Sequence, residues 1–318
     1  MNRHTLDRRQ MLSALGAASV GAAVLPAPAH AQSPDAVPYS TGTGKPKLAA
    51  PANACDCHMH IYGLKYPAIA GALRPHPDAT VADYRLLQKR IGTTRVVVVT
   101  PSLYGTDNSA TLDGMAAFGS LARGVAVVNT SVTDGELQRL NGLGVRGIRF
   151  NLATPGTTTI EMVEPLAKRL APLNWHLQFH MKPEQIVDSE ALLGGLPVPI
   201  VLDHMGRVPR TGALEHKAFA ALRRLIDKGR AWVKLSGAYM DSSAGPPTYA
   251  DSVALAQALI KAAPERMVWG SDWPHPTEKD KPDDAVLFDL LAAIAPDEAV
   301  RNRILIANPA RLSDFPKA

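Results

Sequence analysis

The sequence contains only two cysteines, Cys55 and Cys57. They stand two residues apart in one apolar run, and side chains at that spacing in an extended strand lie too far apart to bond easily. A disulfide framework of the kind that holds small secreted domains together is therefore not expected. We interpret both cysteines as small core residues rather than metal ligands.

Other common signatures are also missing. The chain has no G-x-S-x-G elbow for a serine nucleophile and no G-x-x-x-x-G-K phosphate loop. The formal net charge is only +5, with no basic stripe, so the sequence indicates no nucleic-acid partner. Beyond the first 31 residues no segment is apolar enough to form a stable membrane span.

The N-terminus has the layout of a twin-arginine signal peptide over residues 1–31. Arg8-Arg9 precede a small apolar run over 13–25, and Ala29-His30-Ala31 offers an A-x-A cleavage site. The alternative is an uncleaved amphipathic or membrane-anchor helix. The signal predicts a periplasmic protein that engages the twin-arginine (Tat) export machinery.

Two further regions follow the signal. Residues 32–52 are rich in Pro, Gly, Ser and Thr, which predicts a flexible leader. Residues 53–318 have the length and pattern of one domain, because a barrel of alternating strands and helices needs about 250 residues.

Eight short apolar runs alternate with amphipathic runs along this domain. The apolar runs are nearly continuous in Val, Ile and Leu, as in strands that are buried on both faces. We predict strands over Asn53–His60, Arg95–Ser102, Gly124–Asn129, Gly147–Leu152, His176–Met181, Pro199–His204, Trp232–Gly237 and Met267–Asp272. Helical patterns cover Val81–Ile91, Asn108–Leu121, Asp134–Leu143, Met162–Leu173, His216–Lys228, Tyr249–Ala262, Asp283–Ala295 and Asp297–Leu312.

This unbroken series of strand–helix units predicts an α/β fold, a single-domain (β/α)8 TIM barrel. The alternative is an open doubly wound sheet. Such a sheet would normally carry a glycine-rich phosphate turn after its first strand, where this chain has His58-Met59-His60.

Histidines and an aspartate stand at the ends of four predicted strands: His58 and His60 at the first, His180 at the fifth, His204 at the sixth and Asp272 at the eighth. A barrel of this kind builds its active site from the C-terminal ends of its strands, so we expect these side chains to lie together. Alternate residues of a strand share a face, which predicts that Asp56 lies below His58 and His60. For any single histidine the alternative is a buried imidazole bonded to the backbone.

These residue types suit a hydrolytic centre. Catalytic zinc binds imidazole nitrogen and carboxylate oxygen and keeps one position for water, and His58, His60, His180 and Asp272 could supply that shell. Manganese is the second choice. A metal would acidify bound water, and Asp272 could carry the proton to the leaving group. Without a metal, Asp272 could still act as the general base.

Further candidates surround this centre. Arg149, at the end of the fourth strand, could grip a substrate carboxylate or carbonyl, or form an ion pair in the barrel mouth. Arg207 could do either. Tyr239 and His275 are additional candidates for substrate binding, and His204 is a candidate catalytic residue.

Four motifs taken together resemble the amidohydrolase superfamily, and a fifth run resembles the usual ending of that family. The motifs are Asp56-Cys57-His58-Met59-His60, Gly147-Ile148-Arg149-Phe150-Asn151, Asp203-His204-Met205-Gly206-Arg207 and Trp269-Gly270-Ser271-Asp272-Trp273-Pro274-His275, and the ending is Asn308-Pro309-Ala310-Arg311-Leu312. The likeness is greatest to the lactonase branch, which includes 2-pyrone-4,6-dicarboxylate lactonase, sulfomuconolactone hydrolase, sugar lactonases and galactarolactone isomerase.

The resemblance implies roles for five residues. It implies that His58 and His60 bind metal or substrate, that Asp272 activates water, and that Arg149 and His204 contact the lactone or its carboxylate. Two departures from the metal-free pyrone-dicarboxylate enzyme stand out. His180 replaces a tyrosine, which restores a ligand used by metal-dependent relatives. Two further arginines of that enzyme are missing, since the loop 153–159 has none and Met240 stands in place of the other.

With fewer cationic groups, the chain is better suited to a mono-acid or sugar-derived lactone than to a planar dicarboxylate. The sequence thus predicts an exported hydrolase that opens the ring of a small carboxylated or sugar-derived lactone. The alternatives are a lactone isomerase on the same site, a metal-dependent decarboxylase from a neighbouring branch, and a periplasmic binding module that has lost catalysis.

Overall fold

The computed structural model describes residues 35–70, 72, 78–154 and 156–316. The predicted signal peptide, residues 1–31, lies outside the described residues. Among the residues that are described, no helix is both long enough and apolar enough to cross a membrane.

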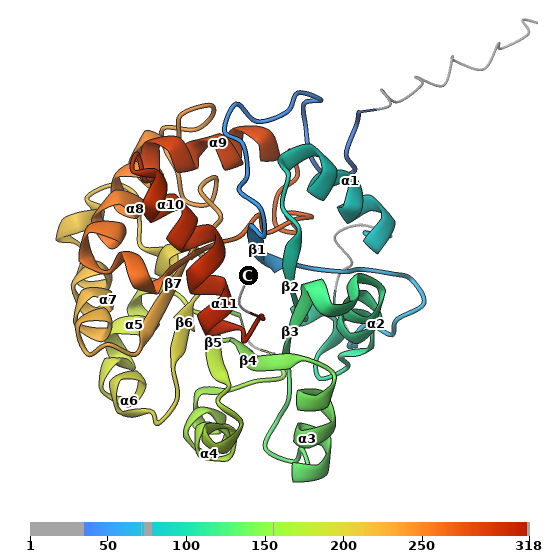
Figure 1. Cartoon of the computed structure of the whole chain (residues 1–318). Coiled ribbons are helices and arrows are strands. Elements are labelled where there is room, and N and C mark those ends of the chain that lie inside the picture. Colours follow the sequence, from blue (N-terminus) through green and yellow to red (C-terminus); the bar gives the residue numbers. More distant parts are fainter. Residues whose placement is uncertain (1–34, 71, 73–77, 155, 317–318) are drawn as a thin grey trace, which may run out of the picture. The chain divides into compact units, whose positions relative to one another are not determined.

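Within the described residues, eight parallel strands form one sheet in which each strand pairs with the next along the chain. Helices surround the ring of strands (Figure 1). The strands are β1 Cys55–Met59, β2 Arg95–Val99, β3 Ala122–Ala126, β4 Val145–Asn151, β5 His176–His180, β6 Ile200–Leu202, β7 Ala231–Leu235 and β8 Met267–Trp269. The predicted α/β barrel and all eight of its strands are confirmed.

The barrel closes where the end of β8 meets β1. The backbone N–H of Asp272 donates to the carbonyl of His58 at 2.8 Å, and that of His60 donates to the carbonyl of Trp273 at 2.9 Å. Gly270 permits this approach, because a Cβ there would lie 2.9 Å from the backbone nitrogen of His58. The seam therefore brings Asp272 beside the two histidines of β1.

The helices match the predicted amphipathic runs closely. They are α1 Val81–Ile91, α2 Ser109–Phe118, α3 Asp134–Gly142, α4 Val163–Leu170, α5 Pro183–Asp188, α6 Glu190–Gly195, α7 Lys217–Asp227, α8 Ala250–Ala262, α9 Asp284–Ile294, α10 Glu298–Asn302 and α11 Asn308–Leu312. Short helices α5 and α6 fill the connection between β5 and β6. The last predicted helix is divided, because a π-helical turn over Arg303–Ala307 separates α10 from α11.

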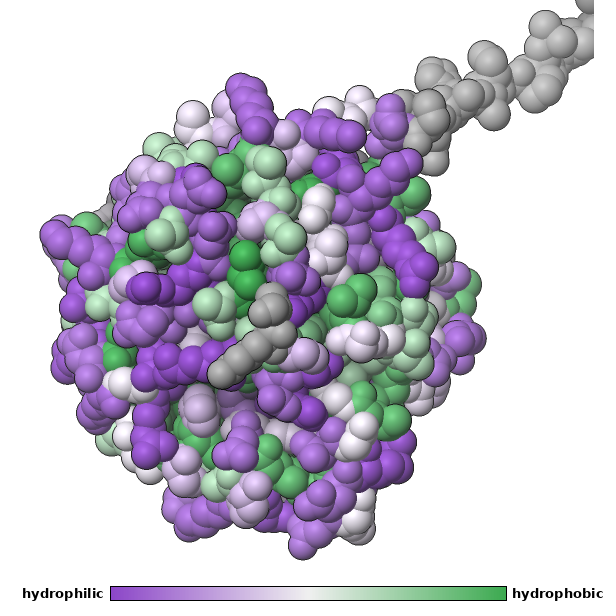
Figure 2. Space-filling model, viewed as in Figure 1, coloured by the Kyte–Doolittle hydropathy of each residue, from purple (hydrophilic) through white to green (hydrophobic). Residues whose placement is uncertain are grey.

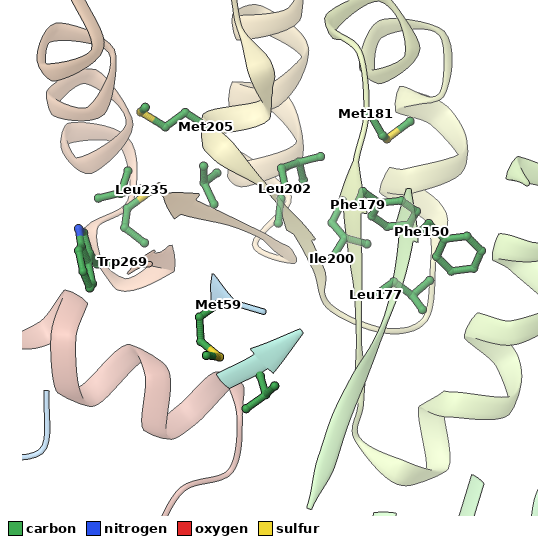
Figure 3. Close-up of a cluster of buried hydrophobic side chains, with 14 of the residues drawn as sticks. Met59, Phe150, Leu177, Phe179, Met181, Ile200, Leu202, Met205, Leu235 and Trp269 are labelled. Carbon is green, nitrogen blue, oxygen red and sulfur yellow. The ribbon is translucent and has the colours of Figure 1, made fainter. Parts of the chain in front are cut away.

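Buried apolar side chains form two layers, one on each face of the sheet. The inner layer fills the barrel and includes Cys55, Cys57, Val97, Val99 and Trp232. The outer layer lies between strands and helices and contains Met59, Phe150, Leu177, Phe179, Leu202 and Trp269, among others (Figure 3). Hydrophilic residues cover most of the face shown in Figure 2. Burial on both faces is what the continuous apolarity of the strands predicts.

Both cysteines are free and buried, with sulfurs 3.7 Å apart, and their predicted role as core residues is confirmed. Their strand contains a β-bulge, because the pairing of β1 with β2 shifts register between Asp56 and Met59. A bulge inserts an extra residue and re-aims the side chains beside it. Strict alternation therefore fails in β1.

The bulge corrects one prediction. Asp56 does not lie below the histidines in the barrel mouth, since its carboxylate accepts a hydrogen bond from the Tyr84 hydroxyl of α1 at 2.9 Å. It also accepts bonds from the backbone nitrogens of His58 at 3.0 Å and Ser271 at 2.9 Å. Asp56 thus fixes the backbone on which the site residues stand.

The described part of the segment predicted as a flexible leader packs on the barrel. Arg90 of α1 donates to the carbonyls of Gly44 at 2.8 Å and Thr41 at 3.0 Å, and the backbone nitrogen of Leu48 donates to Asp289 of α9 at 2.8 Å. Val37 is buried. These bonds hold a segment whose composition alone predicts mobility.

Candidate active site

Four side chains converge at the C-terminal end of the barrel. His58 and His60 come from the end of β1, His204 follows β6 and Asp272 follows β8. The Oδ1 atom of Asp272 lies 3.5 Å from Nε2 of His58, 3.6 Å from Nε2 of His60 and 3.9 Å from Nε2 of His204. All four residues are at most 2% exposed.

The backbone after β6 and β8 is tightly turned. His204, Arg207, Asp272 and His275 all have φ between 50° and 64°, in the left-handed region that non-glycine residues seldom adopt. Such conformations persist only where the surroundings fix them, and they gather at functional sites. The turns aim His204 and Asp272 at the histidines of β1 instead of continuing the strands.

The convergence fits a divalent cation. Two ligands of a tetrahedral zinc, bonded at about 2.0–2.1 Å, lie about 3.4 Å apart. The Nε2 atoms of His58 and His60 are 3.3 Å apart, close to that separation. Potential ligand atoms of His58, His204 and Asp272 all lie within 4.8 Å of one another. The residues that could hold a metal are therefore His58, His60, His204 and Asp272.

The Nδ1 atoms of His60 and His204 have hydrogen-bond partners of their own, which orient the two rings. Nδ1 of His60 donates to the carbonyl of Val99 at 2.7 Å, since a carbonyl can only accept, so in the neutral ring Nε2 keeps its lone pair. Nδ1 of His204 lies 2.9 Å from the Ser236 hydroxyl. Partners of this kind fix which ring nitrogen can bind a metal.

The second carboxylate oxygen of Asp272 begins a partly buried chain of hydrogen bonds. The Tyr239 hydroxyl donates to Asp272 Oδ2 at 2.7 Å, Nδ1 of His275 lies 3.0 Å from that hydroxyl, and Nε2 of His275 lies 3.1 Å from Asp284. Tyr239 and His275 were both expected to bind substrate. The structure places Tyr239 against Asp272 and His275 against Tyr239.

A polar network lies below the convergence, inside the barrel. Lys234 of β7 donates to the carbonyl of Cys57 at 2.8 Å and to Gln178 Oε1 at 2.7 Å, and its Nζ lies 3.1 Å from Nδ1 of His58. Asp203 Oδ2 accepts from Gln178 and from Nε of Arg149, both at 3.1 Å. Arg149 therefore makes the ion pair that was the alternative to substrate binding, although it also lines a cavity.

The charges of the centre follow from these surroundings. Burial alone would raise the pKa of Asp272, but His204, His60 and His58 outweigh it and hold that pKa well below its ordinary value. Burial, and then the Lys234 ammonium, lower the pKa of His58 well below its ordinary value. At neutral pH the centre therefore contains an ionised Asp272 beside an uncharged His58, which suits a cation or a water molecule that gives up a proton.

His180 and Arg207 lie together beside this centre. Arg207 forms two bonds of 2.7 Å to the carboxylate of Asp241, and its Nη1 lies 3.4 Å from Nε2 of His180. The ring of His180 packs edge-on against that of His204, with centroids 5.4 Å apart. Burial lowers the pKa of His180 to about 3. The sequence predicted His180 as a metal ligand beside Asp272. In the structure His204 lies beside Asp272 instead, and His180 packs behind it.

A cavity of about 460 Å³ opens beside the centre. Among the described residues that line it, Arg149 is the one charged group. Hydroxyl and amide groups line much of the rest, contributed by Thr100, Ser102, Asn151, Thr154, Thr157, Thr158 and Thr277. Apolar side chains, among them Ile69, Leu103 and Val127, line the remainder. The described part of the wall is thus mixed apolar and uncharged polar, with a single cation.

Sequence reasoning gave no role to several residues of the site: Gln178, Asp203, Lys234, Ser236 and Asp284. Two of them carry a detectable signal, because Gln178 and Lys234 are polar residues inside otherwise apolar strands. Asp284, at the start of α9, has no such signal and reaches the site only through the fold.

Comparisons with known proteins identify the family of the chain. The amidohydrolase family model matches residues 55–315. A 4-sulfomuconolactone hydrolase of Rhizobium radiobacter is 37% identical, over 83% of this chain and 91% of the relative. A 2-pyrone-4,6-dicarboxylate hydrolase of Comamonas testosteroni is 34% identical, over 88% and 96%. A D-galactarolactone isomerase of Agrobacterium fabrum is 32% identical, over 84% and 93%. The chain belongs to the amidohydrolase family.

Proposed function

We propose that this protein is an enzyme that opens the ring of a small carboxylated or sugar-derived lactone with water as the nucleophile. The observation that carries the proposal is the Asp272 carboxylate, held against three imidazole nitrogens beside a cavity whose described lining includes hydroxyl groups and a single arginine. The family membership and the lactone-processing relatives support it.

The reaction needs one base and one group that holds the substrate. Asp272 takes a proton from water as the water oxygen attacks the ring carbonyl. The bond between that carbon and the ring oxygen then breaks, and the proton passes from Asp272 to the departing oxygen. Arg149 holds the substrate carboxylate or carbonyl in the cavity, and His204, fixed by Ser236, faces the reacting centre.

A divalent cation fits the cluster, with zinc as the first choice and manganese as the second. His58, His60, His204 and Asp272 would hold it, and His180 stands close by as the ligand predicted from sequence. When bound, such an ion makes water more acidic and polarises a carbonyl.

The cavity supports the substrate class. A single arginine can neutralise one carboxylate, and a wall rich in hydroxyl groups can bond the hydroxyls of a sugar-derived ring. A planar dicarboxylate would place its second charge against uncharged residues, which costs free energy unless that charge is paired.

A lactone isomerase is the second candidate, because one relative is named as a galactarolactone isomerase. In that reaction a hydroxyl of the substrate replaces water as the nucleophile, so a new ring forms as the first one opens. The two reactions share Asp272 and differ in whether water is incorporated.

Elemental analysis of protein purified without chelator, combined with a panel of lactones tested before and after metal removal, checks the proposal. We expect about one zinc or manganese per chain and release of a ring-opened acid. Asp272→Asn should abolish turnover and leave the circular dichroism spectrum unchanged. Near-normal activity of that variant would refute the role of Asp272, and incorporation of ¹⁸O from labelled water separates hydrolysis from isomerisation.

We also propose that residues 1–31 direct export to the periplasm through the twin-arginine machinery. The Arg8-Arg9 pair, the apolar run and the Ala29-His30-Ala31 site support this. The double change Arg8→Lys and Arg9→Lys should retain the protein inside the cell in a fractionation experiment. Unchanged export of that variant would contradict the assignment.

A further inference from the structure

We propose that Lys234 and Asp203 compete for Nδ1 of His58 and thereby decide whether its Nε2 can bind a metal. The inference rests on the proposed function only in taking the histidine–aspartate cluster as a cation site. It concerns two positioning residues inside the barrel, neither of which lines the substrate cavity.

Both ring nitrogens of His58 have close polar neighbours. Its Nδ1 lies 3.1 Å from Nζ of Lys234 and 3.3 Å from Oδ1 of Asp203. Its Nε2 lies 3.3 Å from Nε2 of His60. A neutral imidazole carries a single proton, on one of these two nitrogens. His58 can therefore donate a hydrogen bond from Nδ1 or from Nε2, but not from both.

With the proton on Nδ1, His58 donates to Asp203 Oδ1. This bond satisfies an oxygen that is otherwise buried without a hydrogen-bond partner among the described residues. It leaves lone pairs on Nε2 of both His58 and His60, which face each other and Asp272 Oδ1. Three electron-rich atoms at such distances repel one another unless a cation lies between them.

With the proton on Nε2, His58 donates to His60 and its Nδ1 accepts from Lys234. The third ammonium proton then has a partner, since the other two bond to Cys57 and Gln178. Asp203 Oδ1 is left with Lys234 at 3.7 Å, beyond hydrogen-bond range. This arrangement needs no cation, but its Nε2 cannot bind one.

Cation binding therefore moves the His58 proton from Nε2 to Nδ1. Asp203 favours the binding form and Lys234 favours the other. The barrel interior thus sets how tightly the cluster holds a metal, in addition to orienting its ligands.

Two nearly isosteric variants test this. In Asp203→Asn the amide oxygen keeps the bonds from Arg149 and Gln178, which turns its NH₂ toward Nδ1 of His58 and locks the form that does not bind metal. Zinc affinity, measured by chelator competition, should fall about 10–100-fold. Lys234→Met should raise it about tenfold. Loss of charge alone would also lower the zinc affinity of Asp203→Asn and raise that of Lys234→Met, so the position of the proton is the decisive measurement.

That position is read from ¹⁵N shifts of labelled histidine in the full, zinc-stripped protein, with His58→Gln used to assign the signal. We expect His58 to carry its proton on Nε2 without zinc, on Nδ1 with zinc, and on Nδ1 in zinc-free Lys234→Met. Asp203→Asn should keep it on Nε2 at zinc concentrations that saturate the wild type.

A proton already on Nδ1 in the zinc-free wild type would overturn the inference. So would an Asp203→Asn protein with unchanged zinc affinity. If Lys234→Met does not fold, the zinc affinity of Asp203→Asn and the proton position in the wild type without and with zinc still test the proposal. If the wild type binds no zinc but Lys234→Met moves the proton, the competition stands and only the metal part of the proposed function fails.

Discussion

Removal of one hydroxyl group, in Tyr239→Phe, tests how the protein holds its carboxylate base. Oδ2 of Asp272 accepts a 2.7 Å bond from this hydroxyl, while Oδ1 faces the three imidazoles. The bond fixes the carboxylate about its side-chain torsions, so its loss lets Oδ1 turn away from the reacting centre.

The size of the effect follows from the kind of bond. A buried hydrogen bond to a charged group contributes about 1.5–3 kcal/mol. If that energy is used to hold the reactive orientation, kcat should fall roughly 10–150-fold. Tyr239 is not among the residues that line the cavity, so KM should change by less than about twofold.

The assay is steady-state lactone hydrolysis at saturating zinc, so that weaker metal binding does not enter. Tyr66→Phe is the matched control, because it removes a hydroxyl that bonds the Asp113 carboxylate at 2.8 Å outside the cavity lining. We expect the control to keep wild-type kcat. A raised KM with unchanged kcat in Tyr239→Phe would refute the positioning role and restore the substrate-binding role predicted from sequence.

Three further predictions follow from the structure. Arg149→Met should raise KM for an acidic lactone about 10–100-fold, because it removes the one charged group among the described residues of the cavity lining, and an unchanged KM would take Arg149 out of the binding site. Burial lowers the pKa of His176 to about 3, so between pH 6.5 and 3 the unfolded chain binds a proton that the folded one does not, and stability falls with falling pH. His176→Gln should therefore lose about 2 kcal/mol less than the wild type between pH 7 and pH 5 in urea unfolding, and equal losses would contradict the argument. Asp56→Ala leaves the Tyr84 hydroxyl and two backbone N–H groups without their acceptor and should lower the free energy of unfolding by about 3–5 kcal/mol, whereas a change below about 1 kcal/mol would show that water replaces the carboxylate.

The strands and the main site residues were predictable because both depend on one regularity. Parallel strands that are buried on both faces read as continuous apolar runs, and their C-terminal ends meet at one end of the barrel. His58, His60, His204 and Asp272 each stand at or shortly after the end of such a run. Their proximity could therefore be predicted without knowledge of long-range contacts.

Other features depend on geometry that has no periodic signal. The bulge in β1 turns Asp56 toward α1, although alternation places it with His58 and His60. Tyr239 and His275 stand at positions typical of substrate-binding residues, yet the loops turn Tyr239 onto Asp272 and His275 onto Tyr239. The leader has the composition of a flexible segment but bonds to α1 and α9. In each case a distant partner, invisible in local sequence, decides the outcome.

The seam between β1 and β8 determines when the active site can form during folding. Backbone hydrogen bonds join His58 to Asp272 and His60 to Trp273 there, although the chain delivers Asp272 only after seven other strands. Contacts between such distant segments form late, because a long loop must close first. A growing or truncated chain therefore holds histidines without their carboxylate, and the chemistry switches on only when the ring of strands is complete.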